Sequence, residues 1–165
     1  MKEHIFIGID NGVSGSIGVT GVFNHFQKTP VKKELSYTKK KQFISRLDAI
    51  EFTELLTAYL PYYEIHVALE RPLVNPGMFK TTMSAMRCLE STICVLELMR
   101  LPYIYVDSKE WQKEMLPSGL KGSPMLKKAS LDIGCRLFPQ FKEVIVKQKD
   151  ADGILMSEWY RRNYK

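Results

Sequence analysis

The chain has 165 residues, of which 45% are hydrophobic and 25% are charged. This length suits one domain spanning residues 1–165, and this composition excludes a disordered, collagen-like or disulfide-stapled chain. The formal net charge of +6 favours contact with a polyanion such as nucleic acid, although many basic proteins bind none.

The chain opens with a predicted β-hairpin. Residues 4–10 end in the apolar run IFIGID, NGVSGS supplies turn chemistry, and IGVTGVF forms the second strand. The clustered glycines suit either a tight turn beside a catalytic group or a plain glycine-rich hairpin. The run before Asp10 is too short for a signal peptide, and no stretch reaches the ~18 apolar residues of a membrane span. We therefore expect a soluble, cytoplasmic protein with no membrane partner.

The next segments are predicted as a third strand, a helix and a buried strand. Residues 28–41 carry six lysines around Pro30, and we expect an edge strand with a basic exit loop. Apolar residues recur at helical spacing over 41–60, which predicts an amphipathic helix stopped by Pro61. The run IHVALE at 65–70 is typical of a buried strand, and it ends on a charged residue.

The second half of the chain is predicted to be mostly helical. We expect helices over 82–100, 109–115, 123–138 (with Ser123 as N-cap and Pro124 as first residue) and 150–162, and a strand over 102–106. An antiparallel hairpin followed by helical crossovers predicts an α/β domain with a mixed sheet. The cysteines Cys88, Cys94 and Cys135 lack zinc-site spacing, so we expect buried free thiols in a reducing compartment.

Four carboxylates stand out as candidate metal ligands. Asp10 and Glu70 each end an apolar strand, where an acidic side chain adds nothing to packing. Asp150 and Asp152 lie at the start of the last predicted helix, where they would otherwise serve as ordinary helix caps. Together they would suit hard divalent cations, and two such ions can activate water and stabilise the leaving oxygen in phosphodiester hydrolysis. The sequence shows neither a G-x-S-x-G motif nor a Cys/His pair as a competing nucleophile.

The motifs FIGIDNG, VALERP and DADGILMSEW resemble, in order and spacing, the three acidic motifs of RuvC-type Holliday-junction resolvases. YIYVDSKEWQK before a basic helix extends the resemblance over nearly the whole chain. The resemblance implies a ribonuclease-H-like fold, with a mixed five-stranded sheet flanked by helices. It also implies a Mg²⁺- or Mn²⁺-dependent homodimer, with two ions per active site, that makes paired nicks in four-way DNA junctions. A bacterial or bacteriophage enzyme would fit.

The same resemblance assigns metal ligands by motif position. Asp10 and Glu70 correspond to the first two ligands, and Asp152 corresponds to the last. The family usually has an acidic residue or a histidine three positions before the last ligand, whereas this chain has Lys149 there and Asp150 next to it. Residues two apart on a helix do not share a face, so Asp150 would be the fourth ligand only if the helix start is irregular. Alternatively, Lys149 would touch the scissile phosphate.

Two surface groups are candidates for DNA contact. Arg71, Phe79 and Lys80 follow the second acidic motif, where the aromatic ring would stack on an opened base or simply anchor its loop. Lys109, Lys127 and Lys128 belong to a second basic group that would follow the DNA backbone or form a solvated face.

Three alternatives stay open at the level of sequence. The chain would act on RNA–DNA hybrids or flaps within the same fold, or it would be a non-catalytic DNA-binding module. The DNGVSG run also resembles the phosphate loop of actin-like kinases. Those proteins need a second lobe for which 165 residues leave no room, so we expect no nucleotide cofactor.

Overall fold

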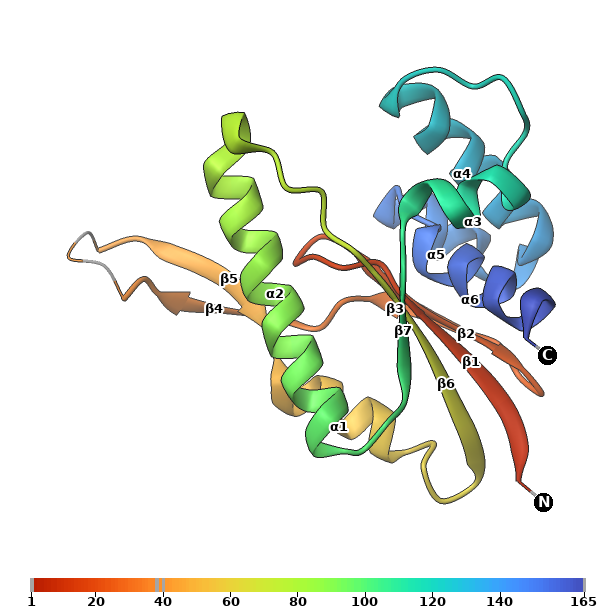
Figure 1. Ribbon diagram of the computed structural model, residues 1–165, viewed down its shortest axis with the longest axis horizontal. Helices are drawn as coiled ribbons and strands as arrows, with labels where there is room; N and C mark the ends of the chain where they lie inside the picture. Colours follow the sequence, from red (N-terminus) through yellow and green to blue (C-terminus); the bar gives the residue numbers. More distant parts are fainter. Residues whose placement is uncertain (1, 38, 40, 165) are drawn as a thin grey trace.

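The computed structural model describes residues 2–37, 39 and 41–164, so Lys40 of the basic run lies outside the described residues. Its main sheet has five strands in the order β3-β2-β1-β6-β7. Their bounds are Glu3–Ile9 (β1), Ser16–Gly21 (β2), His25–Lys28 (β3), Tyr63–Glu70 (β6) and Tyr103–Val106 (β7). The pairs β1/β2 and β2/β3 are antiparallel, whereas β1/β6 and β6/β7 are parallel. The predicted mixed five-stranded sheet flanked by helices is confirmed (Figure 1).

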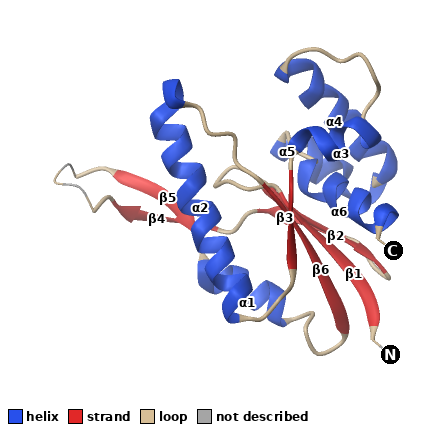
Figure 2. Cartoon of the chain, in the orientation of Figure 1, coloured by secondary structure: helices blue, strands red, loops and turns tan. Residues whose placement is uncertain are grey.

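A hairpin outside this sheet corrects two predictions. Strands β4 (Val31–Leu35) and β5 (Phe43–Leu47) pair only with each other and extend beside helix α2 (Phe79–Leu98), as Figure 2 shows. The strand and exit loop expected over 28–41 are β4 and the loop after it, but β4 lies outside the main sheet. In the main sheet β3 is the edge strand next to β2, so the expected place of the 28–41 strand as the third strand of that sheet was wrong. The predicted helix over 41–60 was also wrong in its first part, because α1 covers only Ala49–Thr57. Asp48 starts α1 by accepting hydrogen bonds from the backbone of Ile50 and Glu51.

The remaining helices match their predictions except at their boundaries. α2 begins at Phe79, directly after a 3₁₀ turn, and α3 covers Ser108–Met115. α4 covers Ser123–Leu137, and Gly122 with a φ of 82° occupies the N-cap, so the prediction of Ser123 as the cap was wrong. The helix expected over 150–162 is α6 (Asp152–Asn163), and a further helix before it, α5 (Lys142–Gln148), was not predicted.

The sheet is covered on both faces. α1 and α2 lie on one side and α3 to α6 on the other (Figure 1). Alternate residues of β1, β2 and β6 send isoleucines and valines into the α1/α2 layer, including Ile5, Ile7, Val19 and Val67. The opposite layer contains Trp111, Ile154, Leu155 and Met156.

Two further findings concern the cysteines and membrane spans. All three cysteines are free thiols, but only Cys88 is buried, so the expectation of three buried thiols was wrong. Within residues 2–37, 39 and 41–164, no helix has both the length and the apolar character needed to cross a bilayer.

Helix α6 lies unusually close to the first two strands. A Cβ on Gly8 would come within 2.2 Å of the Gly153 carbonyl oxygen, and a Cβ on Gly18 within 2.2 Å of the Ile154 Cα. These positions accept no side chain, so the backbones of β1, β2 and α6 meet directly. This contact fixes the start of α6 at the end of the sheet where β1 finishes.

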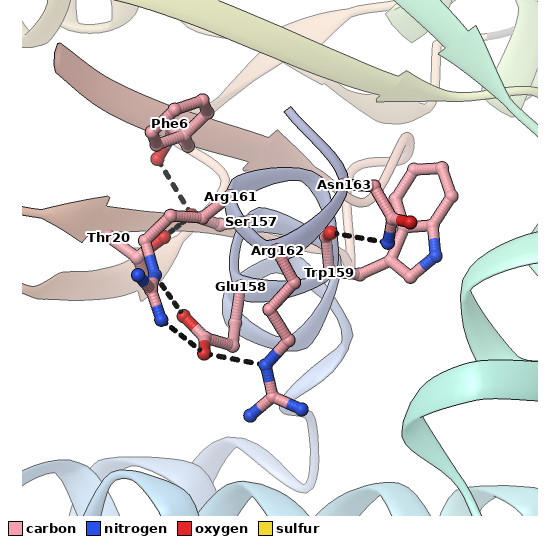
Figure 3. A network of polar contacts seen from close by, with 8 residues as sticks. All are labelled: Phe6, Thr20, Ser157, Glu158, Trp159, Arg161, Arg162 and Asn163. Atoms are coloured by element: carbon pink, nitrogen blue, oxygen red, sulfur yellow. Dashed lines mark hydrogen bonds and ion pairs between the residues drawn. The ribbon is translucent and has the colours of Figure 1, made fainter. Parts of the chain in front are cut away.

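Buried hydroxyls fasten the same helix to both strands (Figure 3). Ser157 donates to the carbonyl oxygen of Phe6 at 2.7 Å, and its oxygen lies 2.7 Å from the Thr20 hydroxyl. Because the single hydroxyl proton of Ser157 goes to Phe6, Thr20 is the donor in the second bond. Within α6 itself, Glu158 accepts hydrogen bonds from Arg161 and Arg162 one turn later.

Candidate functional site

Two parallel strands bring the first two candidate ligands together. Ile9 of β1 is paired with Leu69 of β6, so Asp10 and Glu70, the residues that come directly after them, lie side by side at the same end of the sheet. The backbone N–H of Asp10 donates to the carbonyl oxygen of Ser16 at 3.0 Å, which closes the hairpin turn behind it. A Cβ on Gly15 would lie 2.1 Å from the Asp10 carbonyl oxygen and 3.0 Å from its Oδ2. Any side chain at position 15 would collide with Asp10, so glycine is required there for the Asp10 carboxylate to keep its observed position.

An irregular turn supplies the other two carboxylates. α5 ends at Lys149, whose backbone is left-handed (φ 55°, ψ 39°), and the chain reverses there before α6 begins. Asp150 therefore lies outside the helix, and its Oδ1 accepts the backbone N–H of Asp152 at 3.0 Å. Carboxylate oxygens of Asp10, Asp150 and Asp152 all lie within 4.8 Å of one another. The irregular helix start that Asp150 required is present.

The crowded carboxylates have perturbed acidities. Burial raises the pKa of Asp10 well above its usual value, and the charges of Glu70, Asp150 and Asp152 raise it further. Burial also raises the pKa of Glu70, although hydrogen bonds from Asp10 and Trp111 oppose the shift. The pKa of Asp10 rises because its anion is both desolvated and repelled.

Asp152 shows the same effect. Burial, followed by the charge of Asp150, raises the pKa of Asp152 to about 6, while a hydrogen bond from Ser130 and the nearby charge of Lys127 lower it. Like charges held this close cost free energy unless a cation or a proton offsets them.

The donor set fits a hard divalent cation. The partly buried carboxylates of Asp10, Asp150 and Asp152 meet within 4.8 Å, with Glu70 in contact with Asp10, and oxygen is the ligand that Mg²⁺ and Mn²⁺ prefer. Oδ2 of Asp150 is buried and has no hydrogen-bond partner among the described residues. A buried carboxylate oxygen without a partner is costly, and a bound cation would satisfy it.

Two neighbouring side chains orient the ligands, and the sequence reasoning missed both. The indole Nε1 of Trp111, which is fully buried, donates to Oε1 of Glu70. Ser130, buried in α4, donates a short hydrogen bond to Oδ1 of Asp152. For Trp111 a signal existed, since it is the one aromatic residue in the mostly polar helix SKEWQKEM.

The predicted DNA contacts lie around this end of the sheet. Phe79 and Lys80 are exposed at the start of α2, which Figure 1 places on one side, and Lys127 and Lys128 are exposed on α4 on the other. Arg71 differs, because its guanidinium pairs with Asp107 at 3.0 Å and lies over the Tyr105 ring. Lys109 on α3 and Lys149 are exposed as well. The five lysines among these residues are therefore accessible to a polyanion.

The backbone of the whole chain is similar to solved structures of RuvC. The chain is similar to Thermus thermophilus RuvC in complex with a Holliday junction substrate, with a TM-score of 0.58, 13% identity, and coverage of 97% of this chain and 96% of that one. This chain has the RuvC fold. A second Thermus thermophilus RuvC structure gives a TM-score of 0.54, 14% identity and 96% coverage of both chains.

The match to RuvC extends over the chain from end to end, and it confirms the fold expected from the three acidic motifs. No protein-family model and no curated protein matches the sequence. The likeness to RuvC is thus one of backbone arrangement, and the chemistry has to be argued from the side chains of this chain.

Proposed function

We propose that this protein is a divalent-metal-dependent endodeoxyribonuclease that resolves four-way DNA junctions and related branched DNA. The observation that carries the proposal is the meeting of Asp10, Asp150 and Asp152 within 4.8 Å, with an unpartnered buried oxygen among them. Further support comes from the RuvC fold and from the net charge of +6.

Each acidic residue has a role in this proposal. Asp10, Glu70, Asp150 and Asp152 would hold Mg²⁺ or Mn²⁺, two ions per active site. Bound ions of this kind lower the pKa of water and neutralise charge on the leaving oxygen. Trp111 and Ser130 hold Glu70 and Asp152 in fixed orientations through the hydrogen bonds described above.

The basic residues provide affinity for the DNA backbone. Lys127 is close enough to lower the pKa of Asp152, so a phosphate bound by its ammonium group would lie beside the acids. Lys128, Lys149, Lys80 and Lys109 would extend this contact on the surface. Phe79, 70% exposed at the start of α2, would stack on a base opened at the junction. Arg71 would have to leave Asp107 to reach a phosphate, or else it serves to hold the loop after Glu70.

Symmetric resolution requires two active sites related by a twofold axis, so we propose a homodimer. Sedimentation of the protein alone and on a four-way junction tests this point. A strictly monomeric protein that still makes paired cuts would contradict it.

The decisive experiment compares cleavage of a synthetic four-way junction in Mg²⁺, in Mn²⁺ and in EDTA, with flap and RNA–DNA hybrid substrates alongside. We expect paired nicks with either ion, none in EDTA, and none with Asp10→Asn. Binding of the junction should persist in EDTA, because the lysines and not the acids supply affinity. Preferred cutting of the hybrid or flap would reassign the substrate within the same chemistry. Binding without cutting under every metal condition would indicate a non-catalytic module.

A further inference from the structure

A second group of metal-binding side chains lies at the opposite end of the sheet from the acidic cluster. His4 of β1 is paired with Glu64 of β6, and His66 follows two residues later on the same face. Asp10 lies six positions after His4, just past the end of β1, which corresponds to about 20 Å of extended strand. The two groups therefore cannot share an ion.

The three side chains converge on one point. Nδ1 of His4 lies 2.9 Å from Nε2 of His66, and each of these nitrogens lies 3.9 Å from an oxygen of Glu64. Ligands around a tetrahedral Zn²⁺ at about 2.0–2.2 Å stand roughly 3.3–3.5 Å apart. The two 3.9 Å distances run to Oε2 and Oε1 of Glu64. One ligand atom from each of the three residues lies within 4.8 Å of the other two, so side-chain rotations would place one atom of each on one ion.

The surroundings hold the histidines in this arrangement. His66 is buried, and its ring stacks on Phe6 with a centroid distance of 5.1 Å and contacts Tyr164 at 4.3 Å. His4 stacks on His66 in turn, at 5.1 Å. Rings fixed by such packing lose little rotamer freedom when they bind an ion, which favours binding.

An ion would reach the group from solvent. The side chains of His4 and Glu64 are 46% and 56% exposed, and both border a hollow of about 490 Å³. Lys2 also borders this hollow, but its ammonium group donates to the carbonyl oxygen of Leu60 at 2.7 Å. Protein would fill three positions of a tetrahedral ion and leave the fourth to water.

We propose that His4, Glu64 and His66 form a second metal site, for a divalent ion such as Zn²⁺ that accepts imidazole ligands. Two neutral imidazoles and one carboxylate are a common zinc ligand set, whereas Mg²⁺ prefers oxygen alone. The ion would clip the start of β1 to β6 at the point where the Tyr164 ring packs. Nothing in this proposal depends on the nuclease function.

The test is calorimetric titration of the full chain with Zn²⁺, with Mg²⁺ in large excess to occupy the acidic cluster. We expect one Zn²⁺ per chain. His4→Gln and Glu64→Gln, both at exposed positions, should each weaken this binding at least about tenfold, since even removal of an outer-shell partner costs 10- to 100-fold. His25→Gln is the matched control, because His25 contacts Gln27 and lies outside the cluster. It should bind Zn²⁺ as the parent does.

Imidazole proton NMR of the unaltered protein provides a readout that needs no substitution. The chain has three histidines, so each resonance can be assigned. Zn²⁺ should shift the ring signals of His4 and His66 and leave those of His25 in place. The proposal is overturned if neither His4 nor His66 responds, if His4→Gln binds as tightly as the parent, or if Asp152→Asn alone abolishes the binding. The last outcome would assign the ion to the acidic cluster.

Discussion

The indole nitrogen of Trp111 donates a hydrogen bond to Oε1 of Glu70 at 3.1 Å. This bond lowers the pKa of Glu70 against the effect of burial, so it favours the ionised form that binds a cation. We predict that Trp111→Phe reduces cleavage by roughly 10- to 100-fold and raises the Mg²⁺ concentration needed for half-maximal activity. Cleavage rates over a Mg²⁺ series measure both effects.

Trp159→Phe is the control for lost volume. Trp159 is partly buried in the same apolar layer as Trp111 but lies on α6 and does not bond to Glu70. We expect Trp159→Phe to keep the parent's Mg²⁺ dependence. An unchanged dependence in Trp111→Phe as well would mean that the Trp111 bond does not orient a metal ligand.

The raised pKa of Asp152 makes stability of the metal-free protein depend on pH. Its folded-state pKa is about 6, against roughly 3.9 for an unfolded aspartate, so the folded state holds more protons between these values. The parent should therefore lose stability as the pH rises from about 4 to above about 6, by something on the order of 2–3 kcal/mol from this group. Asp152→Asn removes the penalty, and in EDTA at pH 7 it should be at least as stable as the parent while being inactive.

Urea denaturation at a series of pH values in EDTA checks this expectation. The same denaturation is then repeated with Mg²⁺ in place of EDTA. Mg²⁺ should stabilise the parent more than Asp152→Asn. An ion that binds the folded state lowers the free energy of that state, and the variant lacks one of the proposed ligands. Asp132→Asn, an exposed substitution on α4, controls for the change in net charge. If Asp152→Asn still cleaves DNA, Asp152 is not a metal ligand and serves only to stabilise the start of α6.

Lys127 and Lys128 on α4 are expected to contact phosphates beside the acidic cluster. The double substitution to alanine should make the salt dependence of junction binding shallower by roughly two units of log–log slope. Lys2→Ala with Arg100→Ala removes the same charge at the far end of the sheet and should leave the slope near that of the parent. Binding measured from low to moderate salt decides between a DNA contact and a solvated face.

Ser157 should matter for stability and not for chemistry. Ser157→Ala leaves the buried Thr20 hydroxyl and Phe6 carbonyl without their partner, at a cost of about 1–3 kcal/mol in the free energy of unfolding. Combining it with Thr20→Val should cost less than the sum of the two single changes, since both buried hydroxyls are then gone. Urea unfolding midpoints measure these costs, and additive costs would contradict the network drawn in Figure 3.

The sequence predicted the parts of the site that interrupt a local pattern. Asp10 and Glu70 were identifiable because each ends an apolar strand, and their strands pair in parallel as a mixed sheet requires. Ser130 contacts a distant segment and no local pattern marks its role, whereas the sequence around Trp111 marks an isolated aromatic residue but not its distant partner Glu70. The geometry of Asp150 depends on the left-handed Lys149, a conformation that sequence rarely signals in a residue other than glycine or asparagine.

The wrong helix prediction has a similar origin. Leu47, Ile50 and Leu55 recur at helical spacing, but the segment Phe43–Leu47 pairs with Val31–Leu35 across a loop and becomes a strand. A local signal did exist at Asp48, which is followed three residues later by Glu51, a common pattern at helix starts. Pairing between separate segments overrode the periodicity before that point.

The proposed ligands come from opposite ends of the described chain: Asp10 follows β1, and Asp150 and Asp152 lie at the start of α6. A ribosome therefore delivers the first carboxylate long before the last two. Because α6 packs directly on β1 and β2, the early hairpin also lacks its apolar cover until α6 has emerged. A partly synthesised chain would carry an incomplete set of the proposed ligands, so the proposed activity would arise only after α6 has emerged and folded onto the hairpin.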